Sequence, residues 1–115
     1  MSSWNYNKYG NHKITVAGET FDSKKEYNRW CELKLLERVG EIKQLDRQHR
    51  FQLIPTQRDL QGNVLEKAVT YVADFTYMDK AGNMVVEDVK GFKTPEYIIK
   101  RKMMLYYNGI RVNEI

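Results

Sequence analysis

The sequence has little of what marks secreted, membrane or disulfide-stabilised proteins. Its 115 residues include one cysteine, two prolines and two histidines. Cys31 cannot form an internal disulfide and has no Cys or His nearby at metal-ligand spacing, so we expect a small core residue. No apolar run approaches the roughly 20 residues of a membrane span, and the first five residues lack the basic-then-apolar layout of a signal peptide. These absences predict a cytoplasmic protein without redox chemistry.

The composition is that of one ordinary globular domain. Apolar residues make up 42% of the chain and charged residues 30%, and this length has room for a single core. The formal charge of +4 and the pI near 9.1 fit contact with a polyanion, although many other proteins are equally basic. We divide the chain into an N-terminal arm, residues 1–12, and a single domain, residues 13–115.

Periodicity and turn signals predict a mixed α/β (α+β) fold, a mixed sheet flanked by helices. Thr94 and Pro95 open one helix as N-cap and first-turn proline. The other helix has apolar residues at every fourth position from Tyr27 to Val39, which predicts that it is largely buried, and Gly40 ends it. The predicted elements are a hairpin over 13–21, a helix over 23–39, a strand over 42–53, a loop over 56–67, strands over 68–77 and 84–90, a helix over 94–107 and a strand over 110–115.

The residues that suggest chemistry lie in the predicted hairpin of 68–90. Asp88 and Lys90 project from one face of their strand, because strand side chains alternate. A three-residue loop, 80–82, would pair Asp74 of the partner strand with Asp88. A four-residue loop, 79–82, would set Asp74 opposite Glu87 instead. We favour the first register, because only that one gathers Asp74, Asp88 and Lys90 on one face.

Two opposed carboxylates repel each other across a sheet, so a cation is needed to offset them. Mg²⁺ or Mn²⁺ suits two carboxylates with the remaining positions open to water and phosphate, and Lys90 could orient the attacking water. The alternative is that Asp74 and Asp88 are solvated on an exposed face, with Lys90 as an ion-pair partner.

This constellation resembles the PD-(D/E)XK nuclease superfamily, which has an acidic residue in one strand and Asp or Glu, any residue and Lys in the next. Asp74 and the sequence Asp88-Val89-Lys90 match that pattern, and the element order matches over residues 23–115. Ala73 departs from it, because the superfamily's name has proline there. The segments 21–26, 71–75 and 87–94 are also similar to a family of small uncharacterised phage proteins, which itself resembles Holliday junction resolvases and transposon nuclease subunits. The resemblance implies a restriction-endonuclease-like fold, and a bacterial host cell if the gene is phage-encoded.

Glu26 has two roles open to it. Related nucleases often add a glutamate from the first helix, which would make Glu26 a fourth catalytic residue and a third metal ligand. Ser23-Lys24-Lys25-Glu26 is also a capping box, in which the Glu26 carboxylate would accept a hydrogen bond from the amide of Ser23. The two roles are compatible.

Several basic residues are candidates for contact with the phosphate backbone of a nucleic acid. The resemblance implies a basic side chain near the metal on the second helix, where we choose Lys100, although a solvated helix face is the alternative. Gln48, in the strand before the hairpin, could approach the site. The candidate nucleic-acid contacts are Lys24, Arg29, Lys93, Lys100 and Lys102.

Together these features predict a metal-dependent endonuclease that hydrolyses DNA phosphodiester bonds. The catalytic residues would be Asp74, Asp88, Lys90 and Glu26, and the metal ligands Asp74, Asp88 and Glu26. So small a chain would read DNA shape, such as a double-stranded branch or a Holliday junction, as a homodimer. The alternatives are an RNA-directed nuclease and a non-catalytic module, retaining the nuclease fold, that binds nucleic acid or protein.

Overall fold

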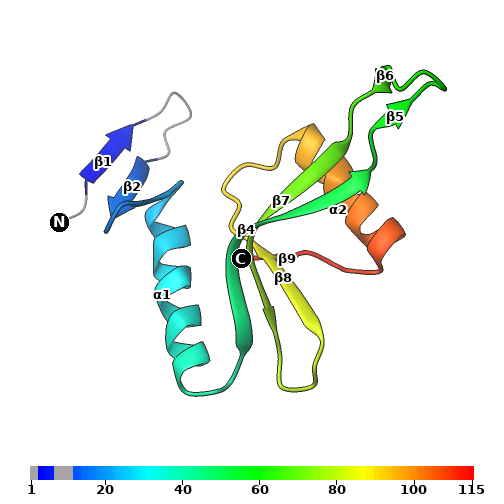
Figure 1. Ribbon diagram of the computed structural model, residues 1–115. Helices are drawn as coiled ribbons and strands as arrows, with labels where there is room; N and C mark the ends of the chain where they lie inside the picture. The colour runs from blue at the N-terminus through cyan, green and yellow to red at the C-terminus, as the bar shows by residue number, and fades with distance from the viewer. Residues whose placement is uncertain (1–2, 7–11) are drawn as a thin grey trace.

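Two helices lie on opposite sides of a central sheet in the computed structural model, which describes residues 3–6 and 12–115 (Figure 1). The elements in chain order are β1 (Ser3–Tyr6), β2 (His12–Val16), β3 (Glu19–Phe21), α1 (Lys24–Arg38), β4 (Lys43–Ile54), β5 (Gln57–Arg58), β6 (Val64–Glu66), β7 (Val69–Met78), β8 (Met84–Asp88), α2 (Pro95–Asn108) and β9 (Asn113–Glu114). This confirms the predicted mixed α+β fold. Neither helix in the described part of the chain is long and apolar enough to span a membrane.

The central sheet has the strand order β4-β7-β8-β9. β4, β7 and β8 form an antiparallel meander, and β9 joins parallel to β8. β1, β2 and β3 form a separate antiparallel sheet beside α1, and β5 and β6 form a two-stranded hairpin that projects beyond the body (Figure 1). The strand order therefore puts β7 and β8, which carry Asp74 and Asp88, at the centre of the main sheet.

Two hydrophobic clusters hold the helices to the central sheet. One joins α2 to the sheet through Tyr71, Val86 and Met104. The other joins α1 to the sheet through Leu33 and Phe75. Ala73 belongs to the first cluster and Phe75 to the second, so Asp74 lies on β7 where one core gives way to the other.

Four sequence-based expectations about the fold were wrong. The segment 56–67, expected to be a loop, contains the β5–β6 hairpin. Residues 3–6, expected within an arm without a regular element, pair with β2 as β1. Cys31 is exposed rather than in the core, and α1 buries only Glu26 and Leu33. Only one face of α1 is buried, because the central sheet covers only that face. The neighbouring face, which carries Cys31, is exposed to solvent.

Candidate active site

The β7–β8 register places Asp74 opposite Asp88. Phe75 is paired with Glu87, so the next position along the same ladder sets the two aspartates across from each other. The amide of Asp79 donates to the carbonyl oxygen of Asn83 at 2.9 Å, which closes a loop of residues 80–82, and Gly82 takes the positive φ of 84° at its last position. The predicted three-residue loop is confirmed, and the register that would oppose Asp74 to Glu87 is excluded.

Three carboxylates from three elements converge at this point. Glu26 of α1, Asp74 of β7 and Asp88 of β8 are 2%, 9% and 0% exposed. Asp74 lies within hydrogen-bonding reach of both Glu26 and Asp88. Since a carboxylate oxygen only accepts, such contacts are hydrogen bonds only when one partner is protonated. The structure thus brings together the three predicted metal ligands.

Both oxygens of Asp74 accept hydrogen bonds, one from a residue of β4 and one from the residue that follows β8. Its Oδ2 accepts a hydrogen bond from the backbone amide of Val89 at 2.9 Å. Its Oδ1 accepts one from Gln48 Nε2 at 3.3 Å, as expected for a residue on the adjoining strand β4. Gln48 has a φ of 56°, a left-handed conformation uncommon for a side chain other than glycine. Asp74 is the fixed centre of the group.

Asp88 has one satisfied oxygen and one without a hydrogen bond. Tyr71 donates its hydroxyl hydrogen to Asp88 Oδ2 at 2.5 Å. Lys90 Nζ stands 3.4 Å from Oδ1, an ion-pair contact, and also lies 4.5 Å from the centroid of the Tyr97 ring. Tyr97 in turn donates its hydroxyl hydrogen to Glu114 at 2.8 Å. Asp88 and Lys90 thus face the same space, although β8 ends at Asp88 and Lys90 lies beyond the strand in which it was expected.

Glu26 divides its two oxygens between the two roles left open by the sequence. Ser23 caps α1, since its side chain accepts from the amide of Glu26 at 3.1 Å. Glu26 Oε2 completes the cap, but on the amide of Asp22 at 2.7 Å rather than on that of Ser23. Glu26 Oε1 is left over for a second partner.

The two leftover oxygens are of the chemical type that binds a hard cation. Glu26 Oε1 and Asp88 Oδ1 are buried and have no hydrogen-bond partner among the described residues. A buried acceptor without a partner costs free energy, and carboxylate oxygens are the ligands that Mg²⁺ prefers. Among the described residues, no group of three or more His, Cys, Asp or Glu side chains has the geometry to hold a metal ion. An ion would enter as the carboxylates move apart.

The pKa values follow from this crowding. Burial raises the pKa of Glu26 to about 8, and the Asp74 carboxylate adds to the rise. Burial likewise raises the pKa of Asp88 to about 8, with Asp74 again adding, while the Tyr71 hydroxyl and Lys90 oppose it. Burial also acts to raise the pKa of Asp74, but hydrogen bonds with Asp88, with Glu26 and from a backbone amide outweigh it and lower the pKa. Near neutral pH the cluster therefore holds protons that a divalent cation would displace.

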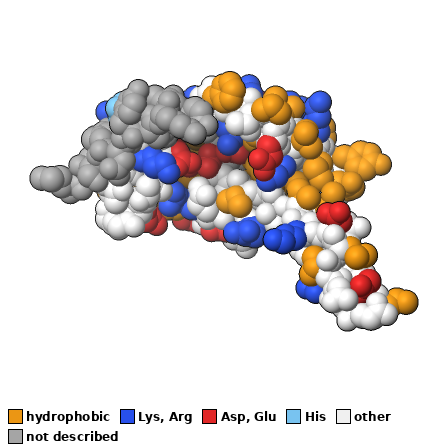
Figure 2. Space-filling model, turned by 90° about the horizontal axis from the view of Figure 1, so that it is seen from above, with side chains coloured by type: hydrophobic (Ala, Val, Ile, Leu, Met, Phe, Trp, Pro, Cys, Tyr) orange, Lys and Arg blue, Asp and Glu red, His pale blue; other side chains and the backbone are white. Residues whose placement is uncertain are grey.

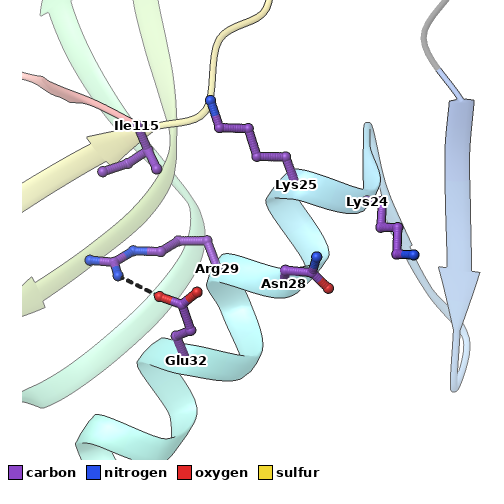
Figure 3. A pocket seen from close by; sticks show the side chains of 6 residues that line it. All are labelled: Lys24, Lys25, Asn28, Arg29, Glu32 and Ile115. Atoms are coloured by element: carbon purple, nitrogen blue, oxygen red, sulfur yellow. Dashed lines mark hydrogen bonds and ion pairs between the residues drawn. The ribbon is translucent and has the colours of Figure 1, made fainter.

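Two hollows flank the carboxylates with basic side chains. One, of about 280 Å³, is lined by Lys90, Lys100, Tyr71 and Tyr97. Seen from above, acidic side chains lie in a recess with Lys and Arg side chains around it (Figure 2). The other hollow, of about 540 Å³, lies between α1 and the C-terminal residue (Figure 3), and its lining residues are Lys24, Lys25, Asn28, Arg29, Glu32 and Ile115.

The basic side chains predicted to contact nucleic acid differ in whether they already form ion pairs within the protein. Lys24 is exposed, and Figure 3 shows it pointing away from the side of α1 on which Lys25 reaches toward the segment after β8. Arg29 is committed to the fold: Nε and Nη2 donate to the buried Glu87 at 2.8 and 2.7 Å, and Nη1 donates to Glu32 at 2.9 Å. These contacts leave the Arg29 guanidinium little freedom to bind phosphate.

The other three predicted contacts lie on or near α2. Lys93 is 3.4 Å from Glu114, and Lys100 forms an ion pair with Glu96 at 2.9 Å while lining the hollow beside Lys90. Lys102 is exposed at a further hollow that it shares with Arg101 and Arg111.

The sequence interpretation missed Tyr71 and Tyr97. Tyr71 holds Asp88, and the face of Tyr97 holds Lys90. The β7–β8 register places Tyr71 near the end of β8. Because Tyr71 is three residues from Asp74, however, regular alternation along β7 would point its side chain to the face opposite Asp74 and Asp88. The Thr94 cap does place Tyr97 in the first turn of α2, close after Lys90 in the chain, and this was the available signal.

A family model described as "Protein of unknown function (DUF1064)" matches residues 6–115 of the chain. No curated protein and no solved structure matches it.

Proposed function

The chain belongs to the DUF1064 family of proteins of unknown function, and from the geometry of its carboxylate cluster we propose that it is a metal-dependent endonuclease acting on DNA. The observation that carries the proposal is the meeting of Glu26, Asp74 and Asp88 beside Lys90, with two buried oxygens that accept no hydrogen bond from the described residues. A purely structural cluster would satisfy those oxygens with donors, as most buried polar groups are. Here the nearest cation, Lys90, reaches only one of them.

Glu26, Asp74 and Asp88 would hold Mg²⁺ or Mn²⁺. Bound there, the ion would lower the pKa of a water molecule and neutralise charge on a phosphate. Asp74 is fixed by Gln48 and by a backbone amide, so it would hold its place while the other two carboxylates release protons and adjust. The resemblance to PD-(D/E)XK nucleases supports the same assignment.

Lys90 would act on the attacking water or on the charge that develops at the phosphate. Its ammonium is placed by Asp88 on one side and by the Tyr97 ring on the other. The hollow it shares with Lys100 and the N-terminal turn of α2 would receive the phosphate, where positive charge stabilises the transition state. Tyr71 fixes the orientation of Asp88 and thereby the position of Lys90.

The alternative function is a nucleic-acid-binding or protein-interaction module without turnover. The observation that favours it is the closure of the site: the three carboxylates are almost wholly buried and lie in mutual contact. If that closed arrangement persists in the presence of metal and DNA, the basic side chains around it still allow binding without cleavage.

The test is incubation of the purified protein with linear duplex, single-stranded and four-way-junction DNA and with RNA, in Mg²⁺, Mn²⁺ or chelator. We expect metal-dependent cleavage of a DNA substrate and none in chelator. Asp88→Asn should abolish it, and Asp46→Asn, which changes an exposed carboxylate on β4, should not. If the protein cleaves none of these substrates, or binds DNA without cleaving it, the result supports the non-catalytic binding module instead. Cleavage that survives Asp88→Asn refutes the assigned site.

A further inference from the structure

The β5–β6 hairpin is an ordered projection with an apolar tip. Its loop uses the sequence Asp59-Leu60-Gln61-Gly62-Asn63, the same Asp-x-x-Gly-Asn pattern as the loop between β7 and β8. The Asp59 carboxylate accepts from the amides of Gln61 and Asn63, each at 2.9 Å, and Gly62 takes the positive φ of 87°. The loop is thus held in one shape, and it presents Leu60 with its side chain 101% exposed.

The base of the β5–β6 hairpin packs in the same hydrophobic cluster as α2. Leu53 and Val69, which flank the hairpin in β4 and β7, pack in the same cluster as Met103 and Met104 of α2. Figure 2 shows hydrophobic side chains on the body beside the projecting hairpin and along the hairpin itself. The exposed large apolar side chains of the two elements are Leu60, Val64, Leu65, Ile99, Leu105, Tyr106 and Tyr107.

The parts of this surface that the two elements can present together are the tip at Leu60 and the helix face at Ile99 and Tyr106, which are 101%, 58% and 83% exposed. Taking roughly 200 Å² for a fully exposed large side chain, they come to the order of 500 Å². The largest patch on a typical monomer covers about 300–600 Å² and is often functional, and two copies that each bury about 500 Å² reach the roughly 1,000 Å² expected of a specific interface. Since an isolated two-stranded hairpin is marginal in water, the hairpin also gains most from packing against another surface.

We propose that this surface is the interface of a two-fold symmetric dimer, in which the β5–β6 hairpin of each copy packs against α2 of the other. The surface carries both a projecting apolar tip, at Leu60, and an apolar helix face beside it, around Ile99 and Tyr106, as a self-complementary contact requires. The apolar residues and the near-neutral hairpin, whose charged residues are Arg58, Asp59 and Glu66, favour a protein partner over the DNA backbone. The surface argument is independent of the chemistry. Its use, to bring two sites to the two strands of a DNA branch, rests on the proposed function.

The first experiment measures the association state of the full chain by analytical ultracentrifugation, without DNA or metal. We expect a dimer whose dissociation constant rises about tenfold or more in Leu60→Asp and in Tyr106→Ser. The matched control is Lys80→Asp, which changes the same position of the other Asp-x-x-Gly-Asn loop and should leave the dimer intact. A wild-type monomer at about 100 µM, or a dimer insensitive to Leu60→Asp, overturns the proposal.

The second experiment tests the geometry by cross-linking in a Cys31→Ser background. Chains with Leu60→Cys, mixed with chains with Ile99→Cys, should form a disulfide between copies on oxidation, whereas Lys80→Cys in place of Leu60→Cys should not. Equal cross-linking by both loops contradicts the exchange of hairpins. Because neither readout uses cleavage, an inactive dimer would refute only the nuclease proposal and an active monomer only the dimer.

Discussion

The buried carboxylates should make the metal-free protein less stable as the pH rises from 6 to 8. Glu26 and Asp88 have pKa values of about 8 in the folded state, against 4.5 and 3.8 as reference values. In this window the folded protein holds protons that the unfolded chain has released. The free energy of unfolding therefore falls by about 1.4 kcal/mol per pH unit for each such proton. Asp74, whose pKa is lowered, contributes in the opposite direction only at lower pH.

Asp88→Asn isolates one of these protons. The amide is close in shape to the protonated acid, so it can accept from Tyr71 and donate to Asp74 without carrying charge. One proton accounts for about 2 kcal/mol between pH 6 and pH 8, because a group with a pKa of about 8 is half deprotonated at pH 8. That is a sizeable part of the 5–15 kcal/mol typical of a domain. The variant should lose stability less steeply with pH than the wild type and exceed it above pH 8.

Urea unfolding at several pH values measures this slope. Unfolding can be followed by tryptophan fluorescence, since the Trp30 ring stacks on Phe75 with 5.9 Å between the ring centroids. Asp46→Asn should keep the slope of the wild type, because its side chain is exposed. Added Mn²⁺ should flatten the fall for the wild type, because a cation replaces the protons. A wild-type stability that is level from pH 6 to 8, or an Asp88→Asn slope equal to it, would show that the cluster holds no such proton.

Four other substitutions test separate parts of the account. Lys90→Met should lower the cleavage rate about a hundredfold or more while the protein still binds Mn²⁺, as single-turnover kinetics and calorimetry would show. Tyr71→Phe should move the acidic limb of the pH–rate profile to higher pH. The hydrogen bond from Tyr71 lowers the pKa of Asp88, so its removal raises that pKa, and an unmoved limb would argue against this role of Tyr71. Arg29→Met should cost about 3–5 kcal/mol in urea unfolding because it strands the buried Glu87 carboxylate, and a loss below about 1 kcal/mol would contradict this. Gly82→Ala should cost about 1 kcal/mol by the same measurement, since the residue has a φ of 84°, and a neutral effect would mean that the loop relaxes.

The register between β7 and β8 was predictable because a local signal determines it. Asp79 and Gly82 specify a three-residue loop, and the loop fixes which residue opposes Asp74. The same Asp-x-x-Gly-Asn pattern at Asp59 and Gly62 could have predicted the β5–β6 hairpin. It was overlooked because the flanking residues show no alternation of apolar and polar side chains, and all of them prove to be exposed.

The wrong expectation for α1 has a tertiary cause. Tyr27 does pack, edge-to-face on Phe21 of β3 at 5.2 Å. The small β1–β3 sheet ends there, so Cys31, Leu35 and Val39 on the same line of the helix stay exposed. Periodicity predicts which side chains share a face, but not how far the opposing surface extends.

The partners of the carboxylates depend on three-dimensional detail beyond the spacing. The sequence left Glu26 as cap or ligand, and the structure gives one oxygen to the cap and leaves the other unpartnered. Tyr71 reaches Asp88 although it lies three residues from Asp74 along β7, where regular alternation would turn it away. The change of core cluster between Ala73 and Phe75 marks the departure from regular alternation.

The central claim, that Glu26, Asp74 and Asp88 form a divalent-cation site, is tested most directly by calorimetric titration of the protein with Mn²⁺ at pH 8. We predict saturable binding with release of protons, seen as a heat that changes with the buffer, which Asp88→Asn loses and Asp46→Asn retains. No saturable binding by the wild type, or equal binding by Asp88→Asn, would contradict the account.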